Sequence, residues 1–292
     1  MSAAATTSES DDLARVNLRL GELVPGADVW PAQLHSAQRH ALLGPGKRFR
    51  PRLCLLVARG LGVEGDAVLD TACVSELVHA ASLILDDLPC MDDAALRRNR
   101  PTTHLAFSES TAILSATALL NHAFGVLMRI DAPAAHKVEL GDALSRAVGS
   151  HGLIAGQVAD LANDNQAVGH ARVERVNALK TGALFDFCVD AAAVLADAEA
   201  ERRAALAEFS GQIGLAFQLL DDLKDVLLSD AQAEKTTGRD AGKATLVHID
   251  GVAEARRRLG GYMLAAKSAV GSAGLSNADE VTALLDMQFA RV

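Results

Sequence analysis

Proline is confined to the first half of this sequence, and its distribution limits the folds that the remainder can form. All seven prolines lie between Pro25 and Pro133, so uninterrupted helices are possible from there to Val292. Strand patterns are weak, because few runs of β-branched residues alternate and hairpin dipeptides are lacking. One long run instead has apolar residues at steps of three or four: Leu206, Phe209, Ile213, Phe217, Leu220, Leu223 and Leu227. These patterns predict an all-α protein.

We expect about ten or more helices, arranged as a single bundle around a central apolar cavity. The expected helices are Leu13–Leu23, Pro31–Leu42, Pro51–Leu61, Ala67–Leu88, Leu105–Arg129, His136–Leu161, Arg172–Leu195, Glu201–Leu228, Val252–Val270 and Asn277–Phe289. No repeat or linker divides the chain, so residues 11–292 are expected to form one domain. Residues 1–10 are rich in serine, threonine and alanine, and we expect a disordered tail there.

Composition and charge exclude several classes of function. The formal net charge of -9 argues against non-specific nucleic-acid binding, which needs a basic surface. No uninterrupted apolar run reaches membrane-spanning length. The four cysteines stand singly, without CxxC spacing, at positions 54, 73, 90 and 188. This spacing favours core thiols in a reducing cytoplasm over a disulfide framework.

Two acidic clusters stand beside apolar helical sequence, at residues 86–93 and 221–225. Carboxylates in such clusters repel one another, and their desolvation is costly, unless a cation neutralises them. Mg²⁺ suits this role, because it binds a few carboxylate oxygens and shares its other positions with water and substrate phosphates. The clusters therefore predict metal ions that hold a diphosphate. A solvated acidic surface, with Lys224 as an internal partner of the second cluster, is the alternative.

The local sequence predicts how each cluster is arranged. Pro89 cannot continue a helix through Asp86, so the helix should end there and Asp92 should turn back toward Asp86. In the second cluster, Asp221 and Asp225 are four residues apart and share a helix face, and Gln218 extends that polar stripe.

Two basic triplets accompany the acidic clusters. Lys47, Arg48 and Arg50 form the first triplet, and Arg97, Arg98 and Arg100 form the second. Arginine binds phosphate groups in bidentate fashion and lysine supplies a point charge, although a solvated surface is the alternative for each triplet. His79 also completes an ExxH step with Glu76, but the second ExxH that a di-iron bundle needs is missing from the sequence.

At these residues the chain resembles the trans-isoprenyl diphosphate synthases, or polyprenyl synthetases. It resembles in particular the bacterial geranylgeranyl diphosphate synthases of carotenoid pathways. The matching segments occur in the family's order, and they are residues 46–51, 86–93, 97–104, Gly156-Gln157 with Asp160, Lys180-Thr181, residues 217–222 and residues 240–247. The resemblance implies the isoprenoid synthase fold, a homodimer, and an Mg²⁺-dependent head-to-tail (1'-4) condensation of isopentenyl diphosphate with an allylic diphosphate.

The resemblance also assigns roles to individual residues. Two aspartate motifs would hold three Mg²⁺ ions around the allylic diphosphate, and they consist of Asp86, Asp87 and Asp92 and of Asp221, Asp222 and Asp225. Contacts to the allylic substrate would come from Arg97, Lys180, Thr181, Gln218 and Lys235. The diphosphate of isopentenyl diphosphate would be held by Lys47, Arg50, His79 and Arg98. The register near Lys235 leaves Arg239 as a competing candidate.

Product length should depend on the volume below the first motif. Farnesyl diphosphate synthases of bacteria resemble this chain but carry an aromatic residue five positions before the first aspartate, where this chain has Ala81, followed by Ser82. A smaller side chain leaves room for growth past fifteen carbons, so geranylgeranyl diphosphate is the expected product and farnesyl diphosphate the alternative. Candidates for the floor of the pocket are Phe107, Leu119, Leu120 and Phe124.

Two other classes of protein compete with this interpretation. A class I terpene cyclase would share the fold and the first motif, but its second metal motif has a wider spacing than Asp221 to Asp225. A non-catalytic regulatory subunit would resemble a synthase, but such subunits typically lose an aspartate motif, and both motifs are intact here.

Overall fold

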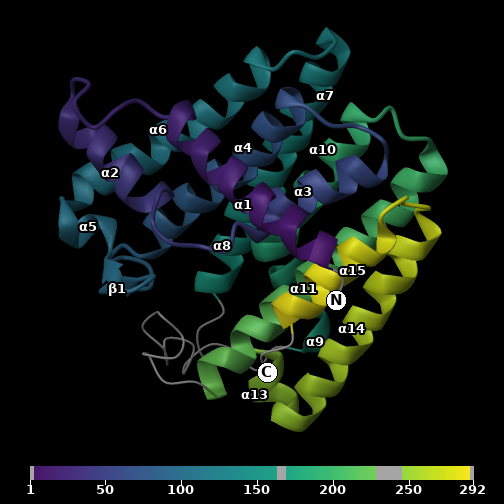
Figure 1. Cartoon of the computed structure of the whole chain (residues 1–292). Helices are drawn as coiled ribbons and strands as arrows, with labels where there is room; N and C mark the ends of the chain where they lie inside the picture. The colour runs from purple at the N-terminus through teal and green to yellow at the C-terminus, as the bar shows by residue number, and fades with distance from the viewer. Residues whose placement is uncertain (1–2, 163–168, 228–244, 290–292) are drawn as a thin grey trace. The chain divides into compact units, whose positions relative to one another are not determined.

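Helices account for most of the described chain, which confirms the all-α prediction (Figure 1). A computed structural model describes residues 3–162, 169–227 and 245–289. The helices are α1 (Ala3–Leu23), α2 (Ala32–Leu42), α3 (Phe49–Gly60), α4 (Asp66–Asp86), α5 (Thr103–Ala106), α6 (Glu109–Arg129), α7 (Ala134–Val148), α8 (Leu153–Leu161), α9 (His170–Asn177), a π-helical turn η1 (Ala178–Gly182), α10 (Ala183–Leu195), α11 (Ala200–Leu227), α13 (Leu246–Asp250), α14 (Val252–Ser272) and α15 (Ala278–Phe289). Strands β1 (Leu96–Arg97) and β2 (Arg100–Pro101) form a short antiparallel hairpin.

The contacts within the chain divide it into two units, and each is described by itself. The described residues of unit 1 are 3–55 and 64–137, and those of unit 2 are 56–63, 138–162, 169–227 and 245–289. Helices α3 and α7 contribute residues to both units. The single domain expected over residues 11–292 stays a prediction.

Unit 1 is built on the pair α4 and α6, with α1 and α2 packed against it. Large apolar side chains of this pair are fully buried, among them Leu77, Ile84, Leu119 and Leu127. Both helices are long and apolar enough to cross a membrane by length and composition alone, and 72% of the most apolar window of α4 is buried inside the protein. A buried core helix such as α4 meets the same criterion, and the corresponding window of α6 is 39% buried, so the two helices are weak evidence for a membrane span.

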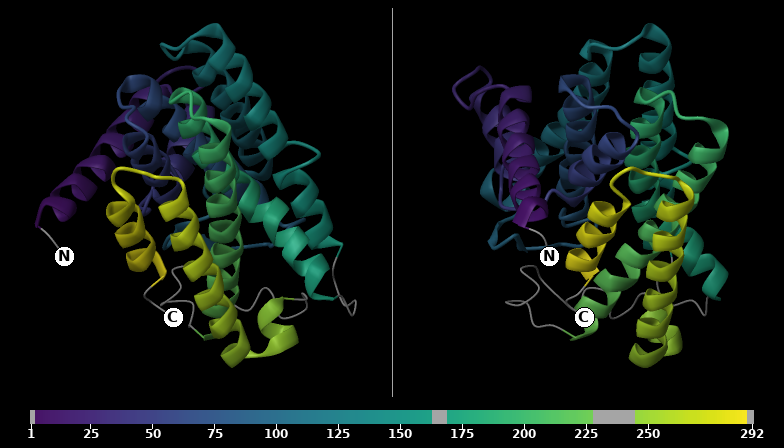
Figure 2. Two further views of the ribbon diagram at one scale, coloured as in Figure 1. Left: turned by 90° about the vertical axis from the view of Figure 1, so that its right-hand side faces the viewer. Right: turned by 45° about the vertical axis from the view of Figure 1, so that its right-hand side comes forward.

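In unit 2, α11 packs along α14 and against α10 (Figure 2). The apolar run predicted for α11 is largely buried: Leu206, Phe209, Ile213, Leu220 and Leu223 are at most 1% exposed. Leu227, at the C-terminal end of the run, is 41% exposed. A Cβ atom on Gly214 would lie 2.6 Å from the Cα atom of Gly182, so glycine allows η1 and α11 to approach closely.

The structure departs from the predicted elements at several places. The predicted helix His136–Leu161 is two helices, because the backbone turns at Gly149–Gly152 and a Cβ atom on Gly152 would collide with the carbonyl oxygen of Ala147. Helix α1 begins at Ala3, and the disordered tail expected over residues 1–10 stays a prediction. The short helix α13, capped by the Thr245 hydroxyl, was not predicted.

Candidate active site

The first aspartate motif lies at the C-terminal end of α4, in unit 1. The helix ends at Asp86, and the backbone N–H of Asp92 donates to the carbonyl oxygen of Asp86 at 2.9 Å. This contact confirms the prediction, made from Pro89, that the chain turns Asp92 back toward Asp86. It brings two half-buried carboxylate residues of the motif next to each other at a helix end, where the helix dipole disfavours negative charge.

Asp87, the third carboxylate of this motif, is bound to an arginine. Its Oδ1 atom accepts hydrogen bonds from Arg97 Nη2 at 2.6 Å and Nε at 3.1 Å. Asp87 is 3% exposed, and this burial raises the pKa of its carboxyl group, while the guanidinium of Arg97 opposes the shift. Arg97, assigned to the allylic substrate by resemblance, therefore also neutralises a buried aspartate of the motif.

The donors of the first motif fit Mg²⁺. Among the described residues, no three Asp, Glu, His or Cys side chains are gathered as a preformed metal centre. Mg²⁺ does not need one, because one or two carboxylates suffice when water and substrate phosphates supply the other oxygens. Asp86 and Asp92, whose backbones are joined by a hydrogen bond, offer two such carboxylates.

The second aspartate motif lies near the C-terminal end of α11, in unit 2. Asp222 is 4% exposed and accepts a hydrogen bond from Gln218 Nε2 at 2.8 Å. The Oε1 atom of Gln218 accepts in turn from the Thr181 hydroxyl at 2.6 Å. Gln218 thus contacts Asp222 and links the motif to η1, while the polar stripe that it was expected to share with Asp221 and Asp225 stays a prediction.

Lys180 lies in the π-helical turn η1 and forms an ion pair with an aspartate of α8. Its Nζ atom is 2.6 Å from Asp160 Oδ2. A Cβ atom on Gly156 would collide with the backbone nitrogen of Lys180, so this glycine lets α8 approach η1. Single π-helical turns are frequent at functional sites, and this one presents Lys180 and Thr181 together. Sequence periodicity could not reveal the turn.

In unit 1, two arginines assigned to isopentenyl diphosphate act on the charge of one histidine, which is assigned to the same substrate. Burial and the positive charges of Arg50 and Arg98 hold the pKa of His79 well below its ordinary value, so the imidazole is neutral near pH 7. Arg50 is 8% exposed, whereas Lys47 lies on the surface. The alternative of a solvated triplet is therefore wrong for Arg50, and it is also wrong for Arg48, which is 3% exposed.

The residues assigned to chain length lie on α4. Ala81 is fully buried, and the Ser82 hydroxyl donates to the carbonyl oxygen of His79 at 3.0 Å. Of the proposed floor residues, Leu119 is fully buried and Phe107 packs its ring edgewise on His40 at 5.6 Å. The floor assignment, including Leu120 and Phe124, stays a prediction.

Lys235 and its competitor Arg239 lie outside the described residues, as do residues 240–244 of the last matching segment. Thr245 is the first described residue of that segment, and its hydroxyl accepts from the backbone N–H of His248 at 3.2 Å.

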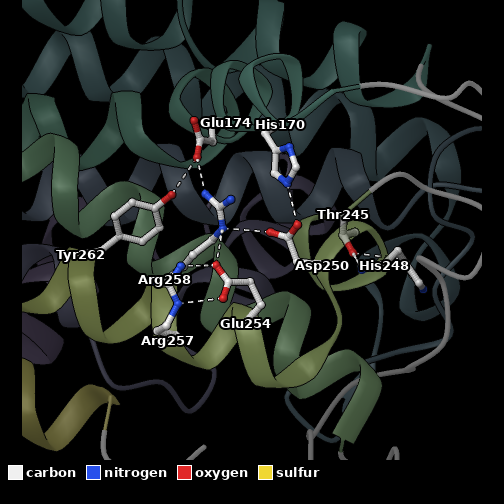
Figure 3. Close-up of polar contacts among 9 residues, drawn as sticks. All are labelled: His170, Glu174, Thr245, His248, Asp250, Glu254, Arg257, Arg258 and Tyr262. Carbon is white, nitrogen blue, oxygen red and sulfur yellow. Dashed lines mark hydrogen bonds and ion pairs between the residues drawn. The ribbon is translucent and has the colours of Figure 1, made fainter.

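A polar network that sequence reasoning missed joins α9, α13 and α14 (Figure 3). His170 Nε2 donates to Asp250 Oδ1 at 2.6 Å, and Arg258 Nε forms an ion pair with Asp250 Oδ2 at 2.9 Å. Glu174 accepts from the Tyr262 hydroxyl at 2.9 Å and from Arg258 Nη1 at 3.4 Å. Asp250 therefore ties the end of α13 to both neighbouring helices.

Asp250→Asn is expected to lower the midpoint of thermal unfolding at pH 7. The hydrogen bond from His170 and the charge of Arg258 hold the pKa of Asp250 below its ordinary value. A carboxyl group with a lower pKa in the folded protein stabilises the fold at pH values above its pKa in the unfolded chain, which is about 3.9. This stabilisation is lost as the pH falls through the pKa of the folded protein. Melting curves from pH 7 to pH 3 should show the gap between wild type and variant closing below about pH 4. A gap of constant size would contradict the assignment.

The residues described in each unit fit a metal-dependent enzyme that acts on diphosphates, because an all-α chain carries two aspartate motifs, arginines that act on a neutral histidine, and a lysine in a π-helical turn. The comparisons agree with that class. The family model described as polyprenyl synthetase matches residues 31–270. The chain belongs to the polyprenyl synthetase family, and it is a prenyltransferase.

Relatives and solved structures support this assignment. The chain is 44% identical to a geranylgeranyl diphosphate synthase of Pantoea ananas over 85% of this chain and 82% of the relative. It is 36% identical to a farnesyl diphosphate synthase of Geobacillus stearothermophilus, with 85% of each chain covered. A geranyltransferase from Helicobacter pylori, solved with magnesium and isoprenyl diphosphate, matches with a TM-score of 0.90 at 28% identity over 99% of both chains. The expected isoprenoid synthase fold is thereby confirmed.

Proposed function

We propose that this protein is a geranylgeranyl diphosphate synthase, which condenses isopentenyl diphosphate with allylic diphosphates until the product has twenty carbons. The observation that carries the product assignment is the fully buried alanine at position 81, five residues before Asp86. The identity to the Pantoea ananas enzyme supports the same product, while the similarity to a farnesyl diphosphate synthase keeps the fifteen-carbon product as the alternative.

In the proposed reaction, Mg²⁺ supplies charge that stabilises the departing diphosphate of the allylic substrate. Asp86, Asp87 and Asp92 of unit 1 and Asp221, Asp222 and Asp225 of unit 2 would hold the ions, three in number by resemblance. By resemblance, Arg97 of unit 1 and Lys180 of unit 2 would each add positive charge for the allylic diphosphate. Because Asp87 and Asp160 already orient these two side chains, their charge is in place before the bond breaks.

The second substrate would be bound by the basic group of unit 1. Lys47, Arg50 and Arg98 offer donors to the diphosphate of isopentenyl diphosphate, and the neutral His79 adds a hydrogen bond. Cleavage of the C–O bond to the allylic diphosphate leaves an allylic cation, and the double bond of isopentenyl diphosphate attacks this cation. The carbocation that results loses a proton from an adjacent carbon to the released diphosphate, which leaves an allylic product longer by one isoprene unit. Exclusion of water protects the cation from hydrolysis.

We also propose a homodimer in the cytoplasm, acting in carotenoid biosynthesis. Exposed apolar side chains on α6 support self-association, since Ile113, Leu114 and Met128 are 45%, 63% and 49% exposed. A molar mass of one chain by light scattering would contradict the dimer.

The test of the proposed function is direct condensation. Purified protein is incubated with Mg²⁺, labelled isopentenyl diphosphate and, separately, dimethylallyl, geranyl or farnesyl diphosphate, and the products are sized by mass spectrometry. We expect a twenty-carbon diphosphate, and we expect product formation to stop with EDTA and to return with added Mg²⁺. A fifteen-carbon product would support the farnesyl alternative. No condensation with any primer would favour the regulatory subunit, and conversion of a primer without use of isopentenyl diphosphate would favour a cyclase.

A further inference from the structure

Arg48 is set apart from the other cations of its triplet by its burial. It is 3% exposed and has a positive φ of 48°, which is uncommon for a residue with a side chain. Its guanidinium donates to the carbonyl oxygens of Gly44 at 2.6 Å and Leu42 at 3.0 Å, and to Asn17 Oδ1 at 2.9 Å. These contacts tie α1, the end of α2 and the following loop together, so this side chain is already occupied by protein groups.

The remaining partner of Arg48 is a buried carboxylate that also faces Arg98. Arg48 Nη1 lies 2.6 Å from Glu76 Oε1, and Glu76 is 3% exposed. The same oxygen accepts from Arg98 Nη2 at 3.5 Å. Glu76 on α4 is therefore shared by an arginine buried under the loop and an arginine assigned to isopentenyl diphosphate.

The loop backbone lies directly against the two guanidinium groups. A Cβ atom on Gly46 would lie 2.9 Å from Arg48 Nη1 and 3.0 Å from Arg98 Nη1. Glycine at this position lets the chain pass over both groups, and the next residue is Lys47. The position of Lys47 thus depends on the same contacts that orient Arg98.

We infer that Glu76 and Arg48 are positioning residues for the isopentenyl diphosphate half of the site: Glu76 aligns Arg98, and Arg48 holds the loop that carries Lys47. The inference rests on the proposed function, which supplies the second substrate. Neither residue contacts substrate in this scheme. They act by fixing the donors that do, and misplaced donors cost binding and rate.

Positioning and simple electrostatics predict opposite results for Glu76→Gln. If only charge mattered, removal of a carboxylate next to Arg98 would strengthen the attraction for a diphosphate and lower the KM for isopentenyl diphosphate. If Glu76 aligns Arg98, the KM rises, because the neutral amide holds the guanidinium less firmly. The sign of the change therefore distinguishes the two.

The experiment measures steady-state kinetics of Glu76→Gln with each substrate varied in turn. We expect the KM for isopentenyl diphosphate to rise about tenfold, and the KM for the allylic substrate to stay within about twofold. The matched control is Asp70→Asn. Asp70 lies on α4, like Glu76, and the substitution weakens its ion pair with Arg19 of α1 (2.6 Å) in the same unit. The control should melt at a lower temperature than wild type without a change in either KM.

Two further variants keep the test decisive if Glu76→Gln folds poorly. Asn17→Ala removes one hydrogen bond to Arg48 from an exposed residue, and it should raise the same KM by a smaller factor. The double variant Arg98→Gln with Glu76→Gln should have the same KM for isopentenyl diphosphate as Arg98→Gln alone, because Glu76 acts on this substrate through Arg98. A KM for isopentenyl diphosphate that is unchanged or lower in Glu76→Gln and unchanged in Asn17→Ala overturns the inference. Absence of condensation by the wild type would instead refute the proposed function.

Discussion

Asp86→Asn is expected to reduce kcat by about 10²–10³-fold, since it removes one oxygen donor from the electrostatic stabilisation of the departing diphosphate. The amide keeps the size of the side chain but not its charge. Asp86 ends α4, where negative charge opposes the helix dipole, so the same change should stabilise the metal-free protein slightly, by about 0.3–1 kcal/mol. Turnover at saturating substrate and melting in EDTA measure the two effects.

The matched control for this experiment is Asp93→Asn. Asp93 lies in the same acidic cluster but is exposed and is assigned no role here. Its φ of 47° is tolerated by asparagine, so the substitution adds no backbone strain. We expect the control to retain wild-type turnover. Equal losses in both variants would mean that the total charge of the cluster matters more than the placement of Asp86.

Ala81→Phe is expected to shorten the product from twenty carbons to fifteen. Ala81 is fully buried on α4, five residues before Asp86, and a phenyl ring at this position would occupy volume that the growing chain needs. Filling a packed site also strains the fold, at a cost of about 1–3 kcal/mol, so a lower melting temperature should accompany the change. Mass spectrometry of the products with geranyl diphosphate as primer measures the switch.

Ala72→Phe provides the control for this substitution. Ala72 is fully buried on α4 like Ala81, but the two residues are nine positions apart and therefore lie on opposite sides of the helix. We expect a similar loss of stability with the twenty-carbon product unchanged. If Ala81→Phe melts lower yet still yields twenty carbons, another side chain limits the product, and the buried alanine no longer carries the assignment.

The helical architecture was predictable because helix formation depends on neighbours three and four residues apart. The apolar run on α11 and the end of α4 before Pro89 both follow from such local rules. These local rules did not predict the backbone conformation where it depends on contacts with a segment distant in sequence. The π-helical turn at Ala178–Gly182 fits against α8 and α11 through Gly156 and Gly214, and no periodicity signals such a fit.

By itself, the sequence determined the class of protein, because the aspartate motifs and basic triplets that carry the family resemblance are contiguous runs of residues. Only the tertiary structure decided which residues of those runs are paired with distant residues of the protein. Arg48 and Arg50 are near neighbours in one triplet, yet Arg48 is paired with buried Glu76, which lies far along the chain. Likewise, Asp160 reaches Lys180 and Gln218 joins Thr181 to Asp222. The reason is physical: a buried charge needs a partner, and which partner it finds depends on the segments that fold against it.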